Sequence, residues 1–368
     1  MELYSYSWRL ASIGLVVCII MLLISHPFVT YNNPQKNNVA KGIWLFFLLY
    51  ILNSIFSFWE WDTYHSWIEF AEVSKYSVYD FTYYEPVYRW LAKATNCHYF
   101  LWRSCIWTPA CLFMYFSGKS LNILNRNFLV SMSLFCAFLY STRNLLGIAM
   151  LLFGLTLLLD KNGRYKLWGV ALVVASYFFH RTMFITMLFA LLAFFPQNKK
   201  SITFLIFLLP FLTIVSTFLI DNIVSGALII GDESNKVTNY ASQEKQVSTL
   251  FGIIQQIITY LPQYLALTYV TVKIIYQHIL KGDRQEYLWT FVFKFSFIAI
   301  YIATIFLFTE TSFWIFERFK YMGMIPLTFV LAKVWSLEPR TNLWVKFIIL
   351  LQLFSLTTRW VIQYYHWS

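Results

Sequence analysis

Three arginines lie at the edges of long apolar stretches of this 368-residue sequence: Arg143, Arg181 and Arg318. A charged side chain in such a place is costly unless it lines a wet cavity or has a partner. A guanidinium stays charged and can bind two phosphate oxygens at once. Together, the three arginines predict a site for a diphosphate. The alternatives are that Arg143 snorkels from a helix end and that Arg318 pairs with a nearby carboxylate.

Aromatic rings and carboxylates occur together in two segments, residues 59–67 (WEWDTYHSW) and 83–90 (YYEPVYRW). A flat ring covers the C–H face of a sugar, and a carboxylate accepts hydrogen bonds from sugar hydroxyls. The pattern therefore predicts sugar binding, and an interfacial helix with an aromatic belt is the alternative. The rings that we expect to contact sugar are Trp61, Tyr64, Tyr88 and, late in the chain, Tyr321.

Three residues are candidates for the base that removes a proton from a sugar hydroxyl: Asp62, Glu85 and His180. Asp62 is the preferred carboxylate because aromatic residues flank it, whereas Glu85 is expected to position the acceptor. The guanidinium of Arg181 favours a neutral imidazole at His180 through like-charge repulsion, and a neutral imidazole can accept a proton. The alternative is that His180 is a packed, hydrogen-bonded histidine with no catalytic role.

The composition predicts the elements that must position these residues. Hydrophobic residues make up 59% of the chain and charged residues 12%, about half the charged share of a typical soluble domain. A run of about 18 or more apolar residues is typical of a membrane span. We predict one all-α domain, residues 1–368, a polytopic membrane bundle of about twelve transmembrane helices. The predicted spans are approximately 9–25, 42–58, 98–116, 127–141, 144–159, 165–179, 182–196, 202–220, 249–273, 288–308, 312–333 and 343–364.

Charge divides the predicted loops and span ends into two sets. One set holds 16 of the 28 basic residues but only four of the 17 acidic ones. Lys and Arg favour cytoplasmic loops, so this set is predicted to face the cytoplasm and both termini to face outward. The net charge of +11 is thereby explained without nucleic-acid binding. Two long loops, about 59–97 and 221–248, face outward, and function is often carried by such loops.

Five short motifs follow one another along the chain: Asp62-Thr63-Tyr64, Glu85-Pro86-Val87-Tyr88, Thr142-Arg143-Asn144, His180, and Arg318-Phe319-Lys320-Tyr321. In order and spacing, over about residues 40–335, the chain resembles the EpsG-type, Wzy-like polymerases of bacterial exopolysaccharide and O-antigen. It departs from the family pattern at Asn144, where Gln is usual, and at Arg181, where a small residue or Pro is usual.

This resemblance implies a membrane glycosyltransferase with a GT-C-like fold. No cofactor or metal is expected, because the guanidiniums can take the role that Mg²⁺ has in other enzymes. It implies that undecaprenyl-diphosphate-linked repeat units are polymerised at the outer, periplasmic face of the bacterial inner membrane. The growing chain is then the donor, and the incoming unit supplies the acceptor hydroxyl. The implied partners are these two lipid-linked glycans, the bilayer and a chain-length regulator protein.

Rival functions also fit parts of the sequence. A transporter or flippase of lipid-linked sugars fits the number of spans, although the polar residues gather on the outer side rather than along a path. A metal-dependent GT-C transferase fits Glu60 and Asp62, a Glu-x-Asp pair able to bind a divalent cation. A membrane acyltransferase fits His180, but no acidic partner lies near it in sequence. A ligase or a single-addition transferase would share the polymerase features.

Overall fold

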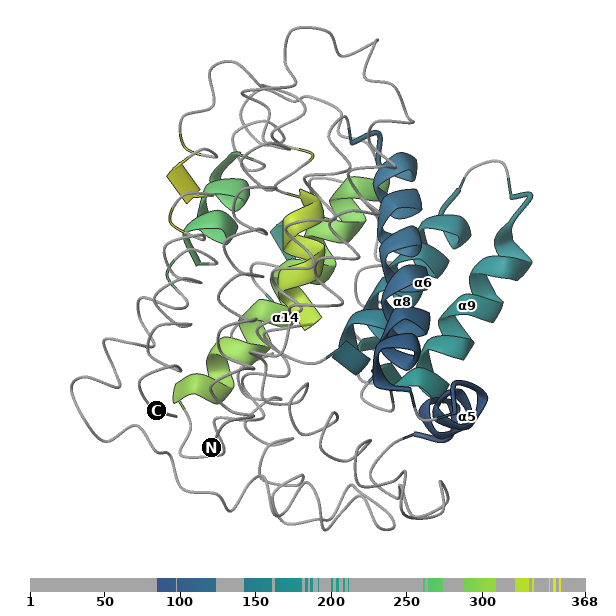
Figure 1. Ribbon diagram of the computed structural model, residues 1–368. Helices are drawn as coiled ribbons and strands as arrows, with labels where there is room; N and C mark the ends of the chain where they lie inside the picture. The colour runs from purple at the N-terminus through teal and green to yellow at the C-terminus, as the bar shows by residue number, and fades with distance from the viewer. Residues whose placement is uncertain are drawn as a thin grey trace, which may run out of the picture. The chain divides into compact units, whose positions relative to one another are not determined.

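The computed structural model describes residues 85–96, 98–123, 142–160, 163–180, 264–273, 287–308 and 322–330, together with shorter stretches and single positions. These further positions are 183–184, 186–187, 191, 200, 203–204, 208, 211, 261, 333, 344, 347–348 and 351. The regular structure of this described part is α-helical, as the sequence predicts (Figure 1). Within it, no helix combines the length and the hydropathy that crossing a bilayer requires. The number of spans and the GT-C arrangement stay predictions.

The chain divides into two compact units. The first contains Met1–Met187 together with Leu331–Asn342 and Trp360–Ser368, and the second contains Leu188–Val330 and Leu343–Arg359. Most of the candidate chemistry that the structure describes belongs to the first unit, so that unit is described in more detail.

The first unit contains four helices whose bounds are described: α5 (Pro86–Ala94), α6 (Tyr99–Ser120), α8 (Thr142–Leu158) and α9 (Lys166–Phe179). Helix α8 packs against both α6 and α9, and α5 contacts α6 and α9. In Figure 1, α5 is seen almost along its own axis at one end of the other three helices. Helices α6, α8 and α9 coincide with the predicted helical stretches 98–116, 144–159 and 165–179. Helix α5 lies within the predicted outer loop 59–97.

Local sequence signals fix where α5 begins and ends. Pro86 occupies its first turn, where the missing amide hydrogen costs nothing, and Glu85 is the N-cap residue. At the other end, the Thr95 hydroxyl donates to the carbonyl of Leu91 at 2.9 Å, and Asn96 turns the chain with a φ of 50°. A nine-residue helix is too short to be stable alone, so packing against its neighbours must hold α5 in place.

Helices α8 and α9 approach each other closely at two glycines. A Cβ atom added to Gly154 would lie 2.9 Å from the carbonyl oxygen of Gly169, and one added to Gly169 would lie 2.8 Å from that of Gly154. Only glycine allows two backbones to approach in this way. A short connection joins the two helices, so they run antiparallel and the end of α9 returns to the start of α8.

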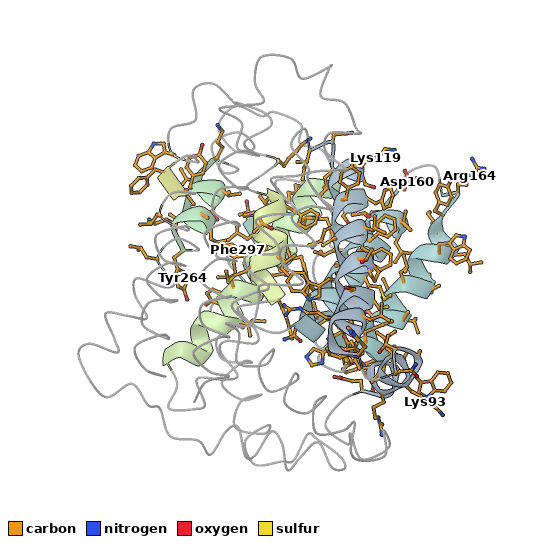
Figure 2. All side chains as sticks on the ribbon, viewed as in Figure 1. Lys93, Lys119, Asp160, Arg164, Tyr264 and Phe297 are labelled. Carbon is orange, nitrogen blue, oxygen red and sulfur yellow. The ribbon has the colours of Figure 1, made fainter. Side chains whose placement is uncertain are left out.

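The predicted topology assigns four charged residues of the first unit to opposite ends. Lys119, Asp160 and Arg164, all assigned from sequence to the cytoplasmic set, lie at one end in Figure 2. Lys93, assigned to the outer set, lies on α5 at the opposite end. The chain therefore separates these four residues along the helix axes in the predicted sense. The facing of each end relative to a membrane stays a prediction.

The second unit contains α14 (Tyr287–Phe308), which coincides with the predicted stretch 288–308, and helical residues 264–273 and 322–330. Ser296 of α14 donates a hydrogen bond to the carbonyl of Gly323 at 3.0 Å. A Cβ atom on Gly323 would lie 2.6 Å from Cγ1 of Ile300, so a glycine is again needed where two helices cross. The segment 322–330 follows directly after the predicted site residues Arg318 and Tyr321, which lie outside the described residues.

Candidate functional site

Glu85 and His180 are brought into contact in the first unit. The Oε1 atom of Glu85 lies 2.6 Å from Nδ1 of His180, although the two residues are 95 positions apart in sequence. Both are buried, with 8% and 5% of their surfaces exposed. A contact of this length between a carboxylate and an imidazole is a charge-assisted hydrogen bond, which is stronger than a hydrogen bond between neutral groups.

Two helix termini position this pair. Glu85 precedes α5, and its carbonyl accepts hydrogen bonds from the amides of Tyr88 and Arg89 at 3.0 and 3.3 Å. His180 ends α9 in an extended conformation, and its amide donates to the carbonyl of Ser176 at 3.1 Å. The positive end of α5 therefore lies beside the carboxylate, and the negative end of α9 lies beside the imidazole. Both helix dipoles stabilise the charges that the pair carries when the imidazole takes up a proton.

Tyr88 holds α5 against the two helices that surround it. Its ring makes edge contacts with Phe179 of α9 and Trp102 of α6, at centroid distances of 6.1 and 6.0 Å. The indole N–H of Trp102 also donates to the carbonyl of Tyr88 at 3.1 Å. With 1% of its surface exposed, Tyr88 is a packing residue that fixes Glu85, one turn away. A contact between Tyr88 and sugar stays a prediction.

The start of α8 reaches the same end of the unit. A Cβ atom added to Gly147 would lie 2.9 Å from Cγ of Met183 and 3.5 Å from Cβ of His180. Arg143 lies four residues before Gly147, so its backbone is about 6 Å further along α8 toward the helix start. Arg143 and His180, which were predicted from separate motifs, therefore belong to one region of the unit. The side chain of Arg143 lies outside the described residues.

Arg103 of α6 is a buried guanidinium that the sequence analysis did not select. It has no exposed surface, and its Cζ atom lies 4.8 Å from the ring centroid of Trp107, within the range of a cation–π contact. The rings of Phe113 and Phe153 stack at 5.6 Å between α6 and α8. Arg103 lies ten residues before Phe113 in α6, and Arg143 lies ten residues before Phe153 in α8. Each arginine is therefore about 15 Å of helix from the stacked rings, so the two backbones lie at a similar height along the helix axes. The sequence signal that could have identified Arg103 is its position as a charged residue inside an apolar stretch.

Six predicted site residues lie outside the described residues: Trp61, Asp62, Tyr64, Arg181, Arg318 and Tyr321. The same holds for Glu60, the other half of the alternative metal pair. Within the described ranges, no cluster of three or more His, Cys, Asp or Glu side chains is arranged to hold a metal ion. The structure thus unites Glu85, Tyr88 and His180 and brings the Arg143 backbone near them.

Comparison with known proteins gives one match. The model of the EpsG family matches residues 43–367, nearly the whole chain. Neither the curated proteins nor the solved structures contain a match to the sequence or the fold.

Proposed function

Because this chain belongs to the EpsG family, we propose that it is a membrane glycosyltransferase that polymerises lipid-linked oligosaccharide repeat units. The substrates are undecaprenyl-diphosphate-linked glycans, and the reaction takes place at the outer face of the bacterial inner membrane. The observation that carries the proposal is the buried contact between Glu85 and His180. This contact lies in the region where three of the short motifs come together, those that contain Glu85, Arg143 and His180.

His180 is the general base in this proposal, and Glu85 orients it. A neutral imidazole that donates its Nδ1 proton to Glu85 carries its lone pair on Nε2. Nε2 accepts the proton of the acceptor hydroxyl as that oxygen attacks the anomeric carbon of the donor sugar. A new glycosidic bond forms while the bond between the anomeric carbon and the phosphate oxygen breaks. The electron pair of the broken bond leaves with the lipid diphosphate.

The 2.6 Å contact changes the role that the sequence suggested for Glu85. A carboxylate already bonded to the imidazole acts through His180 rather than by positioning the acceptor alone. In the proposed mechanism, His180 therefore takes precedence over Asp62 as the base, and Asp62 binds sugar hydroxyls beside Trp61 and Tyr64.

The arginines stabilise the leaving group. Arg143 and Arg318, supported by Arg181, bind the donor diphosphate and neutralise the negative charge that develops on it. Guanidiniums can supply this charge stabilisation in place of Mg²⁺, so the proposed reaction is independent of metal. Arg103 adds a further positive charge at the level of the α8 start, which favours an anionic group at this end of the unit.

Turnover by purified protein tests the proposed function. Full-length protein in vesicles is supplied with a single defined lipid-linked repeat unit, and the products are separated by length. The expected result is a ladder of products, each longer by one whole unit. Movement of the unit across the vesicle membrane without a longer product would instead indicate a flippase. Addition of one unit and no more would indicate a ligase or a single-addition transferase.

The Glu85–His180 pair also favours a second candidate, a membrane acyltransferase. Such an enzyme needs a histidine with an acidic partner, and the structure supplies the partner that is not adjacent in sequence. Incubation of the purified protein with a radiolabelled acyl donor and the lipid-linked unit separates the two functions. The polymerase lengthens the glycan without incorporating label, whereas the acyltransferase transfers label without lengthening it.

A further inference from the structure

Asn144 of α8 has a buried polar atom that no described residue satisfies. Only 3% of the residue is exposed, and, among the residues that the structure describes, its Oδ1 atom accepts no hydrogen bond. Leaving a buried amide oxygen without a donor costs free energy, which native proteins rarely tolerate without a reason. Asn144 is the third residue of α8 and lies inside the helix, so N-capping does not account for it.

The position of Asn144 relates this oxygen to the candidate site. Asn144 and Gly147 are three residues apart, so they share one face of α8. Gly147 meets the His180–Met183 turn, and a Cβ atom on it would lie 3.5 Å from Cβ of His180. Side chains on a helix lean toward its N-terminus, which for Asn144 is the end of the unit that holds the Glu85–His180 pair. The amide oxygen is therefore buried on the helix face that meets His180.

We propose that Asn144 is a specificity-determining residue whose Oδ1 accepts a hydrogen bond from a hydroxyl or acetamido N–H of the substrate sugar. The inference rests on the proposed function. A neutral amide oxygen suits a sugar donor group, because it is an acceptor and adds no repulsion toward an anionic diphosphate nearby. A site with a buried acceptor discriminates strongly against an analogue that lacks the matching donor, because the acceptor then stays unsatisfied.

Two substitutions separate a binding role from a structural one. Asn144→Leu keeps the approximate volume and removes the unsatisfied oxygen, so it should leave the thermal stability of the ligand-free protein unchanged or raise it. It should raise KM for the lipid-linked unit by about 10- to 100-fold and change kcat by less than about threefold. Asn144→Gln keeps a neutral amide oxygen as acceptor on a side chain one methylene longer, so its KM should stay closer to that of the wild type than the KM of Asn144→Leu. Thr156→Val is the matched control, because Thr156 is buried in the same helix and bonds within it, at 2.7 Å to Phe153.

A series of lipid-linked units, each lacking one hydroxyl or acetamido group, identifies the donor. The wild type should reject one analogue by about 100-fold or more, and Asn144→Leu should treat that analogue and the intact unit alike. Unchanged KM in Asn144→Leu, or an equal loss for every analogue, would overturn the inference while the polymerase function stands. Failure of the wild type to lengthen any unit would overturn both.

Discussion

Replacement of Glu85 by Gln tests whether the contact with His180 serves catalysis. The substitution keeps the size of the side chain but removes the charge that lies 2.6 Å from Nδ1 in a buried place. A hydrogen bond to a charged group contributes about 1.5–3 kcal/mol, against about 0.5–1.5 kcal/mol for a neutral one. The amide can also rotate and donate to Nδ1, which moves the imidazole proton to Nε2 and removes the base.

The expected loss in kcat for Glu85→Gln is about 10- to 100-fold, because about 1.4 kcal/mol of lost transition-state stabilisation corresponds to a tenfold slower rate. His180→Gln removes the base itself and should lower kcat by about 10²–10⁴-fold. Since Glu85 acts through His180, the double variant should be no slower than His180→Gln alone. KM for the lipid-linked unit should change little in all three.

The assay is the rate of elongation of a defined lipid-linked unit by purified protein in vesicles. Lys93→Gln is the matched control, because it changes the charge on the same helix by one unit at an exposed position (Figure 2). It should retain activity within about threefold of the wild type. Full activity of Glu85→Gln, or independent losses that multiply in the double variant, would refute the reasoning.

Three further predictions follow from the helix contacts and the proposed mechanism. Gly147→Val should lower kcat at least tenfold, because a Cβ atom 2.9 Å from Met183 displaces the turn that begins at His180; elongation rates measure this effect. Trp102→Phe should lower the free energy of unfolding by about 1–3 kcal/mol, since the carbonyl of Tyr88 loses a buried donor at 3.1 Å; thermal denaturation in detergent checks it. Elongation should continue at the same rate after dialysis against EDTA, and a loss restored by Mg²⁺ would favour the alternative metal site.

The sequence predicted α6, α8 and α9 because their apolar runs are long and continuous. Their approximate positions follow from these runs, and the residue types of Glu85 and His180 selected them as chemical groups. Their pairing was not predictable, since 95 residues separate them and no local pattern relates one to the other. No acidic partner was therefore predicted for His180.

Other features depended on tertiary contacts that a single sequence does not reveal. The packing of Tyr88 between α6 and α9 is one such feature, because its neighbours in sequence indicate only an aromatic-rich segment. The helix α5 was expected to be part of a loop, since its nine residues are too few to form a recognisable apolar run. The Oδ1 atom of Asn144, which accepts no hydrogen bond from the described residues, is a further feature of tertiary structure.

The glycine contact between α8 and α9 has a consequence for how the Glu85–His180 pair assembles. With Gly154 and Gly169 in contact through their backbones, these two long helices cannot slide past each other without separating. The nine-residue α5 is joined to α9 by Tyr88 and by the carboxylate–imidazole contact itself. In the proposed mechanism, docking of α5 therefore also forms the contact that orients the base, and any movement that lifts this short helix would stop proton transfer.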